Sequence, residues 1–134
     1  MNKIATKTGI ENMPVSLYDR LGGYDGLAMF ATTVVGLARK DDLLGRFWTN
    51  RGEDRNAREL QLLIDYFVKE TGGQMYYRGR DMALSHQGMG ITEADWTRFI
   101  EIVVSVAGDM GVGPDEGGEV MAFLDGLKDD IVSV

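Results

Sequence analysis

The residues best suited to chemistry lie in the stretch GRDMALSHQGMGIT, which runs from Gly79 to Thr92. It holds His86, the only histidine among 134 residues, and the chain has no cysteine. These counts exclude disulfides, thiolate ligands and a cysteine nucleophile, and they leave a structural zinc site without its usual ligands. A metal held by carboxylates alone remains compatible with the composition. A Ser-His-Asp triad would need His86, but the adjacent Ser85 would point about 100° away from it on a helix.

Haem is the cofactor that fits this inventory. Non-covalent haem needs an axial nitrogen ligand, which a neutral imidazole supplies, and an apolar slot lined by several helices. Taken alone, however, the composition and spacing favour a structural histidine at His86 over a haem ligand. The acidic pairs Asp41-Asp42 and Asp129-Asp130 are adjacent in sequence, so we expect them to be solvated rather than catalytic.

The elements that must position His86 are helices, because apolar residues recur at helical spacing nearly throughout. Ser16 and Thr92 each precede an aspartate by three residues, which is typical of a helix start. The class predicted is all-α, with a flexible N-terminal arm over 1–15 and one folded domain over 16–134. Glycine-rich 108–118 is expected to be a loop. The main helices are predicted at 25–39, 55–70, 93–107 and from Val120 to Ile131.

Net charge argues against some partners. The chain carries 14 basic and 21 acidic residues, for a net charge of −7. An acidic surface disfavours nucleic acid and anionic membranes. No window approaches a membrane-spanning apolar run, and the N-terminus lacks the apolar core of a signal peptide. We therefore expect a cytoplasmic protein.

Three motifs occur in order and carry a family resemblance. They are LYDRLGG (Leu17 to Gly23), the pair Gly72-Gly73, and the run from Tyr77 through Arg80, Met82 and His86 to Thr92. On these motifs the chain resembles the group 1 truncated haemoglobins over about residues 16–132. The resemblance implies a two-over-two helical sandwich around one haem b, with His86 as the proximal iron ligand. A backbone carbonyl near Met82 is the expected acceptor for the second ring nitrogen.

The resemblance also implies a set of haem contacts. Arg78 and Arg80 could pair with haem propionates, or they could be solvated surface arginines. Phe47 and Trp48 match an aromatic pair of the family. For each apolar contact the alternative role is ordinary core packing. The cofactor-binding residues expected are Trp48, Leu63, Phe67, Arg80, Met82, Ile91, Phe99 and Val103.

The distal side departs from the family pattern. Val35 stands where a tyrosine is usual, Leu63 replaces a common glutamine, and Leu62 replaces a lysine. The preceding loop is about three residues longer, so the register over 50–63 depends on where those residues are placed. A hydrogen-bond donor on the distal side stabilises bound oxygen by about 1.5–3 kcal/mol. Without one we expect fast oxygen release, favoured CO and NO binding, and quick oxidation. Trp48 is the best substitute donor, ahead of Thr32 and Gln61.

Three functions are compatible with these residues. The first is a haem protein that reversibly binds a diatomic gas, which could be O2, NO or CO. The second is a haem enzyme, either an NO dioxygenase supplied by a reductase or a peroxidase, although no distal acid is assigned from the sequence. The third is a haem-free globin-like interaction domain. The gas-binding function is the one that the motifs favour.

Overall fold

The computed structural model describes residues 15–49, 51–74 and 82–132, in which helices are joined by turns and short loops. Predicted arm residues 1–14 lie outside these ranges, as do Tyr77, Arg78 and Arg80. Within the described ranges there is no strand, so the predicted all-α class is confirmed. None of the helices in these ranges is long and apolar enough to cross a bilayer. The elements are α1 (Leu17–Arg20), α2 (Gly23–Lys40), the 3-10 helix η2 (Gly45–Phe47), α3 (Glu53–Glu70), α4 (Met82–His86), α5 (Glu93–Asp109) and α6 (Pro114–Ile131).

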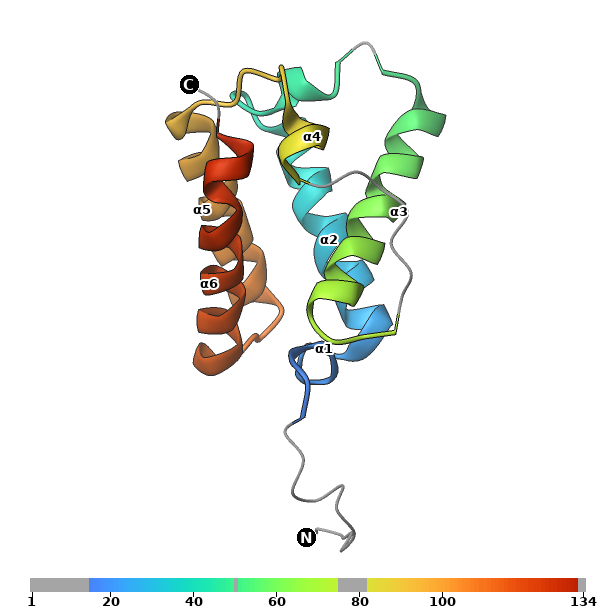
Figure 1. Cartoon of the computed structure of the whole chain (residues 1–134), viewed down its shortest axis with the longest axis vertical. Helices are drawn as coiled ribbons and strands as arrows, with labels where there is room; N and C mark the ends of the chain where they lie inside the picture. The colour runs from blue at the N-terminus through green and yellow to red at the C-terminus, as the bar shows by residue number, and fades with distance from the viewer. Residues whose placement is uncertain (1–14, 50, 75–81, 133–134) are drawn as a thin grey trace, which may run out of the picture.

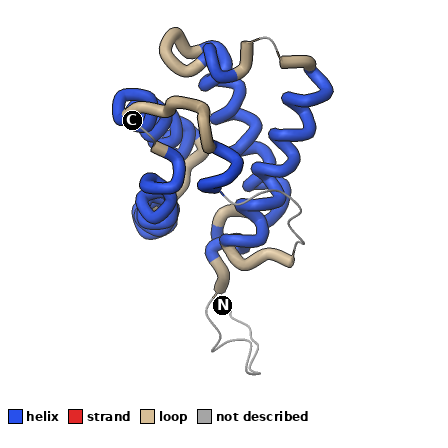
Figure 2. Tube along the Cα trace, turned by 45° about the horizontal axis from the view of Figure 1, so that its top comes forward, coloured by secondary structure: helices blue, strands red, loops and turns tan. Residues whose placement is uncertain are grey.

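The long helices form two antiparallel pairs that are packed against each other. Figure 1 shows α2 beside α3, and α5 beside α6, with the short α4 standing between the two pairs. Contacts between α2 and α5 join the pairs, and α4 packs against α6. The same arrangement is visible in the tilted view of Figure 2. The predicted two-over-two sandwich is therefore confirmed.

The packing follows from the spacing of apolar residues. On α2, the buried residues Leu27, Ala31, Val34 and Ala38 recur every three or four positions and so share one face. Leu27 and Ala31 meet Ile64 and Val68 of α3 in one cluster. Each large aliphatic side chain buried in this way contributes about 1.5–3 kcal/mol relative to exposure. The main core combines Val34, Ala38, Leu44, Trp96, Ile102, Val103, Val106 and Leu124.

The starts of α5 and α6 show one confirmed prediction and one wrong one. Thr92 and Asp95 form the predicted capping box, in which each side chain accepts the other's backbone N–H. By contrast, 114–118 was expected to be loop but belongs to α6. Pro114 occupies the first turn, where its missing N–H costs nothing, and Asp115 complements the helix dipole there. Because the glycines were interpreted as a loop, the start of this helix was predicted too late in the chain.

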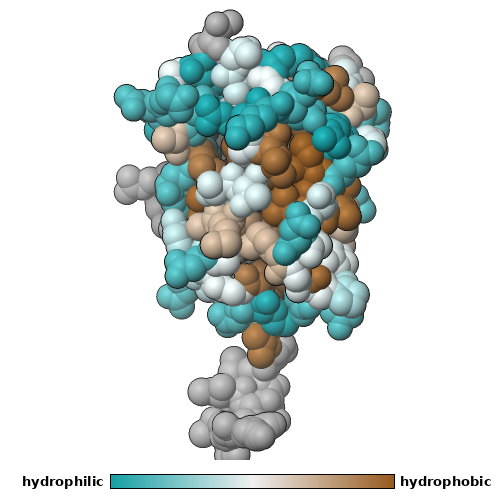
Figure 3. Space-filling model, turned by 180° about the vertical axis from the view of Figure 1, so that it is seen from behind, coloured by the Kyte–Doolittle hydropathy of each residue, from teal (hydrophilic) through white to brown (hydrophobic). Residues whose placement is uncertain are grey.

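Apolar side chains also reach the surface. Figure 3 shows an apolar area, bordered by hydrophilic residues, on the face opposite that of Figure 1. Exposed large apolar residues include Met29 and Leu37 on α2 and Val104 on α5. Single exposed apolar side chains such as these three are normal for a globular domain.

The Gly72-Gly73 pair ends α3 by close backbone approach. Gly72 has a φ of 107°, a conformation that favours glycine. A Cβ on Gly73 would stand 2.6 Å from Val68 Cγ1 and 2.8 Å from the Tyr18 ring. Directly before this pair, Thr71 O at the end of α3 accepts from the Tyr18 N–H of α1 at 2.9 Å. The second pair of glycines is thus needed for the contact between α1 and α3.

We expect Gly73→Ala to lower the free energy of unfolding by about 1–3 kcal/mol, because the added methyl overpacks this contact. The matched control is Gly126→Ala on α6, where an added Cβ meets nothing within 4 Å. The control should raise the free energy by about 0.5–1 kcal/mol through helix propensity. Urea unfolding of both variants measures the two changes. Equal effects of the two substitutions would contradict the packing argument.

Candidate functional site

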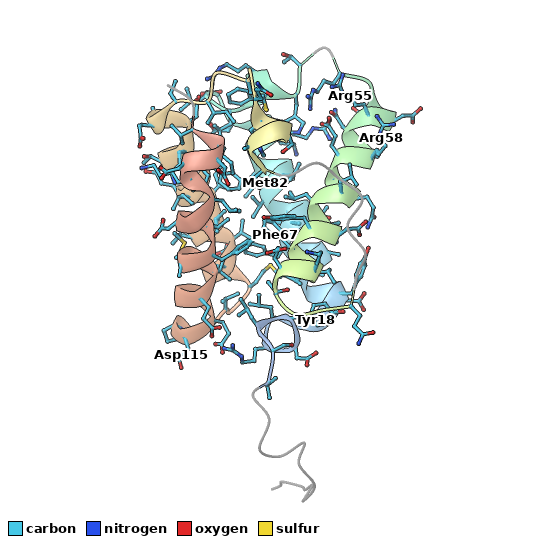
Figure 4. The ribbon with its side chains drawn as sticks, in the orientation of Figure 1. Tyr18, Arg55, Arg58, Phe67, Met82 and Asp115 are labelled. Carbon is cyan, nitrogen blue, oxygen red and sulfur yellow. The ribbon has the colours of Figure 1, made fainter. Side chains whose placement is uncertain are left out.

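His86 ends the five-residue helix α4, and a backbone carbonyl one turn earlier contacts its ring. The ring nitrogen Nδ1 lies 2.9 Å from Met82 O. A carbonyl oxygen only accepts hydrogen bonds, so Nδ1 is the donor, and in the neutral imidazole of this tautomer Nε2 keeps its lone pair. The acceptor expected near Met82 is therefore confirmed. Figure 4 places Met82 at the start of α4 and Phe67 on α3. A half-buried imidazole with an unprotonated Nε2 is the form that ligates a metal.

Ser85 lies closer to His86 than the sequence predicted. Its Oγ is 3.0 Å from His86 Nδ1, although adjacent helical residues were expected to diverge. The cause is a shared acceptor, because Ser85 Oγ also donates to Met82 O at 3.3 Å. The pair is still no nucleophile and base, since Nδ1 is protonated and has no lone pair to take the serine proton.

The segment after α4 turns sharply toward α5. Gly88 and Gly90 have φ values of 79° and 69°, which other residues rarely adopt. Met89 N–H closes the turn on His86 O at 3.2 Å. Ile91 is then buried, and Thr92 caps α5. The direction of this segment is thus fixed from His86 to the helix that follows.

An apolar cavity of about 360 Å³ lies between the helix pairs. That volume is within the usual range for a small-molecule pocket. Four predicted cofactor contacts line it together, namely Leu63, Phe67, Phe99 and Val103. Aromatic rings pack around it, with the Phe67 and Phe123 ring centroids 5.8 Å apart in an edge-on arrangement. The sequence thus predicted four residues that share one apolar space.

This cavity is not lined by the other predicted contacts, among them Trp48, Met82 and Ile91. Phe47 and Trp48 are half-buried and pack against the same main cluster as Phe67 and Phe99. Met82 is half-buried on α4. Val35 is half-buried, whereas its neighbour Val34 is buried and lines the cavity. Arg80 lies outside the described residues.

The turn that carries Phe47 and Trp48 begins at Asp41, which was wrongly expected to be solvated. The Asp41 side chain is only 10% exposed and accepts from Arg98 Nε at 2.7 Å. It also accepts from the N–H groups of Leu43 and Leu44. The Arg98 guanidinium holds the pKa of Asp41 below its usual range. Asp41 therefore joins the turn to α5.

Two suggested distal donors lie on the surface. Thr32 is exposed on α2. Gln61 is exposed on α3, where its Nε2 donates to Tyr24 Oη at 2.8 Å and to Asp65 Oδ1 at 2.9 Å. Neither side chain turns toward the core, which leaves Trp48 as the candidate donor named from the sequence.

A half-buried carboxylate that sequence reasoning did not assign lies in the N-terminal half of α3. Glu59 precedes Leu63 by four residues and so shares its helix face. It pairs with Arg51, and Arg55 Nε donates to its second oxygen at 3.3 Å. The uncertain loop register hid this pairing, because Arg51 belongs to the longer loop. The apolar face of α3 is thus bordered by charge at its N-terminal end.

The described ranges contain no group of three or more histidine, cysteine, aspartate or glutamate side chains arranged for a metal ion. His86 can supply one imidazole ligand to a metal group that brings the rest of its own ligands, such as haem. Such a group needs one free imidazole nitrogen and apolar walls for a flat ring system. His86 supplies the nitrogen and the cavity supplies apolar walls, but His86 itself does not line that cavity.

Comparisons with known proteins agree with this geometry. No protein-family model matches the chain. A truncated haemoglobin structure from Tetrahymena pyriformis, in the Fe(III) form, superposes with a TM-score of 0.80 at 19% identity and covers 90% of this chain and 100% of that one. The two-over-two haemoglobin of Synechococcus, solved with covalently attached haem, gives a TM-score of 0.72 at 26% identity over 81% of this chain and 89% of that one.

Sequence similarity carries the assignment further. Group 1 truncated haemoglobin of Tetrahymena pyriformis is 21% identical over 90% of this chain and 98% of its own length. Group 1 truncated haemoglobin GlbN of Mycolicibacterium paratuberculosis is 32% identical over 120 residues, covering 90% of this chain and 86% of that protein. With that identity over nearly the full length, and with the same helical sandwich, the chain belongs to the group 1 truncated haemoglobins.

Proposed function

We propose that the chain binds one haem b, without a covalent link, through Nε2 of His86. The observation that carries the proposal is the 2.9 Å hydrogen bond from Nδ1 to Met82 O, which leaves Nε2 free to ligate. An outer hydrogen bond of this kind also orients the ring and raises its basicity as a ligand. When bound, haem supplies the iron at which a diatomic gas coordinates.

Apolar side chains from three helices would hold the ring system. Leu63 and Phe67 come from α3, and Phe99 and Val103 come from α5. Met82 and Ile91 flank His86 along the chain, while Trp48 closes the opposite side. Their shared role is to exclude water and to bury the porphyrin, which stabilises in proportion to the apolar area removed from water. Arg80 would pair with a propionate.

On the face opposite His86 we propose reversible binding of O2, NO or CO. Val35 and Leu63 carry no hydrogen-bond donor there. Oxygen depends on a donor more than CO does, so oxygen should leave quickly and the iron should oxidise readily. A reductase partner that restores the ferrous state belongs to the same proposal.

A peroxidase-like activity is the second candidate, and Glu59 is the observation that favours it. A carboxylate on the face of α3 that carries Leu63 is a possible proton donor and acceptor for a peroxide. Both of its oxygens are already paired, one with Arg51 and one with Arg55, which supports gas binding as the first candidate.

Titration of the purified full chain with haemin tests the cofactor. We expect a Soret band that saturates at one haemin per chain, with the position typical of an imidazole ligand. The control is iron-free protoporphyrin IX, which fits the same apolar walls and lacks the metal. A spectrum that never saturates, or that is independent of iron, would sink the proposal.

A further inference from the structure

The proposed function leaves one buried charge unused, the carboxylate of Asp95 at the start of α5. Asp95 is 1% exposed. Its Oδ1 accepts from Arg46 Nη1 at 2.9 Å and its Oδ2 from Arg46 Nη2 at 2.6 Å, a two-pronged ion pair. Arg46 holds the pKa of Asp95 below its usual range, against the opposing effect of burial. Ionised at neutral pH, this carboxylate is a fixed anchor inside the fold.

One end of the anchor holds the turn that carries Trp48. Arg46 lies in η2, and its guanidinium stands 4.2 Å above the Phe47 ring. The same guanidinium donates to Leu43 O. Trp48 follows directly, with its N–H bonded to Gly45 O at 3.0 Å. Moving Arg46 would therefore move the aromatic pair.

The other end holds the segment that follows His86. Thr92 N–H donates to Asp95 Oδ2 at 2.9 Å, and Asp95 N–H donates to Thr92 Oγ1 at 3.0 Å. Thr92 comes directly after the buried Ile91 and six residues after His86. Asp95 Oδ2 thus receives donors from both segments at once.

We propose that Asp95 is a positioning residue that couples the two sides of the site, setting the Trp48 turn through Arg46 and the segment after His86 through Thr92. The inference rests on the proposed function, because the two segments flank a common ligand only if haem lies between α3 and α4. Two strong hydrogen bonds to one rigid carboxylate leave little freedom for either segment to shift alone.

The chain offers a matched control in Asp41 and Arg98. This second ion pair joins the same turn to the same helix, at 2.7 Å. The Asp41 side chain accepts from the backbone N–H groups of Leu43 and Leu44 and from Arg98, so these bonds stay within the turn and α5. A substitution there loosens only the turn, whereas a substitution at Asp95 loosens both segments.

The test compares Asp95→Asn with Asp41→Asn in the haem-loaded full chain. The iron–histidine stretching band reports the His86 side, and the C–O stretching band of the CO-treated ferrous protein reports the opposite side. We expect Asp95→Asn to shift or split both bands and Asp41→Asn to change the C–O band alone. Unchanged bands in Asp95→Asn, or the same pattern in both variants, would overturn the coupling.

Amide hydrogen exchange of the haem-free chain provides a second measurement that does not depend on the cofactor. Asp95→Asn should speed exchange about tenfold or more over both 43–48 and 87–92, as expected when a charge-assisted hydrogen bond is lost. Asp41→Asn should do so over 43–48 only. Arg46→Lys keeps the charge without the two-pronged geometry and replaces Asp95→Asn if that variant does not fold. Failure of haemin to bind the unmodified chain would refute the proposed function. Faster exchange in only one of the two segments of Asp95→Asn would refute the coupling.

Discussion

His86→Gly should abolish the imidazole-type Soret band, and added imidazole should restore it. Loss of an outer hydrogen-bond partner alone weakens metal binding by about 10–100-fold, so loss of the ligand itself should cost more than about 100-fold in haemin affinity. The glycine leaves a gap of the shape of the missing ring. Free imidazole can enter this gap and present a nitrogen at the same place, which links the lost band to coordination rather than to unfolding. Haemin titration with and without imidazole measures both effects.

Ser85→Ala is the control for this experiment. It removes the 3.0 Å contact at Nδ1 but leaves the bond to Met82 O, so the tautomer is kept. We expect a change in haemin affinity below about tenfold, since the main outer partner remains. Retention of the full Soret band in His86→Gly without imidazole would show that another residue holds the iron.

The sequence predicted what depends on local pattern. Apolar spacing placed α2, α3 and α5 to within a few residues, because one helix face had to be buried. The position of His86 one turn after Met82 predicted the carbonyl acceptor, because residues four apart lie on the same helix face. These features need only neighbours along the chain.

Contacts between distant segments were not predicted. Arg46 and Asp95 are 49 positions apart, and Arg98 and Asp41 are 57 apart. No periodicity connects such pairs, and each residue alone resembles an ordinary surface charge. Asp41 was therefore expected to be solvated, although two backbone N–H groups and a guanidinium surround it. Glu59 was missed for a related reason, because its partner Arg51 lies in a loop of irregular length.

The two sides of the site thus differ in what fixes them. The His86 side is set by a short helix, two glycines and a capping box, all readable from sequence motifs. The opposite side depends on how α2 and α3 pack, and its chemistry depends on which residues that packing presents. The effect of the missing hydrogen-bond donor on this opposite side is best tested by introducing one.

Val35→Tyr should slow oxygen release from the ferrous haem-loaded protein by about tenfold to a hundredfold. Val35 is half-buried on α2, next to Val34, which lines the apolar cavity. A tyrosine there would bring a hydroxyl to a side that has no donor on Val35 or Leu63. A hydrogen bond to a charged acceptor is worth about 1.5–3 kcal/mol, which corresponds to that change in rate if association is unaffected. Stopped-flow displacement of oxygen by CO measures the rate.

Val35→Phe separates the hydroxyl from the added bulk. Both aromatic rings fill the same space and carry the same packing cost, about 1–3 kcal/mol if the core is tight. Only tyrosine donates a hydrogen bond, so the oxygen dissociation rates should differ between the two variants while their CO dissociation rates stay close. If tyrosine and phenylalanine release oxygen at the same rate, then Val35 does not face the gas, and the distal donor must be sought in Trp48 or in the Arg51–Glu59 pair instead.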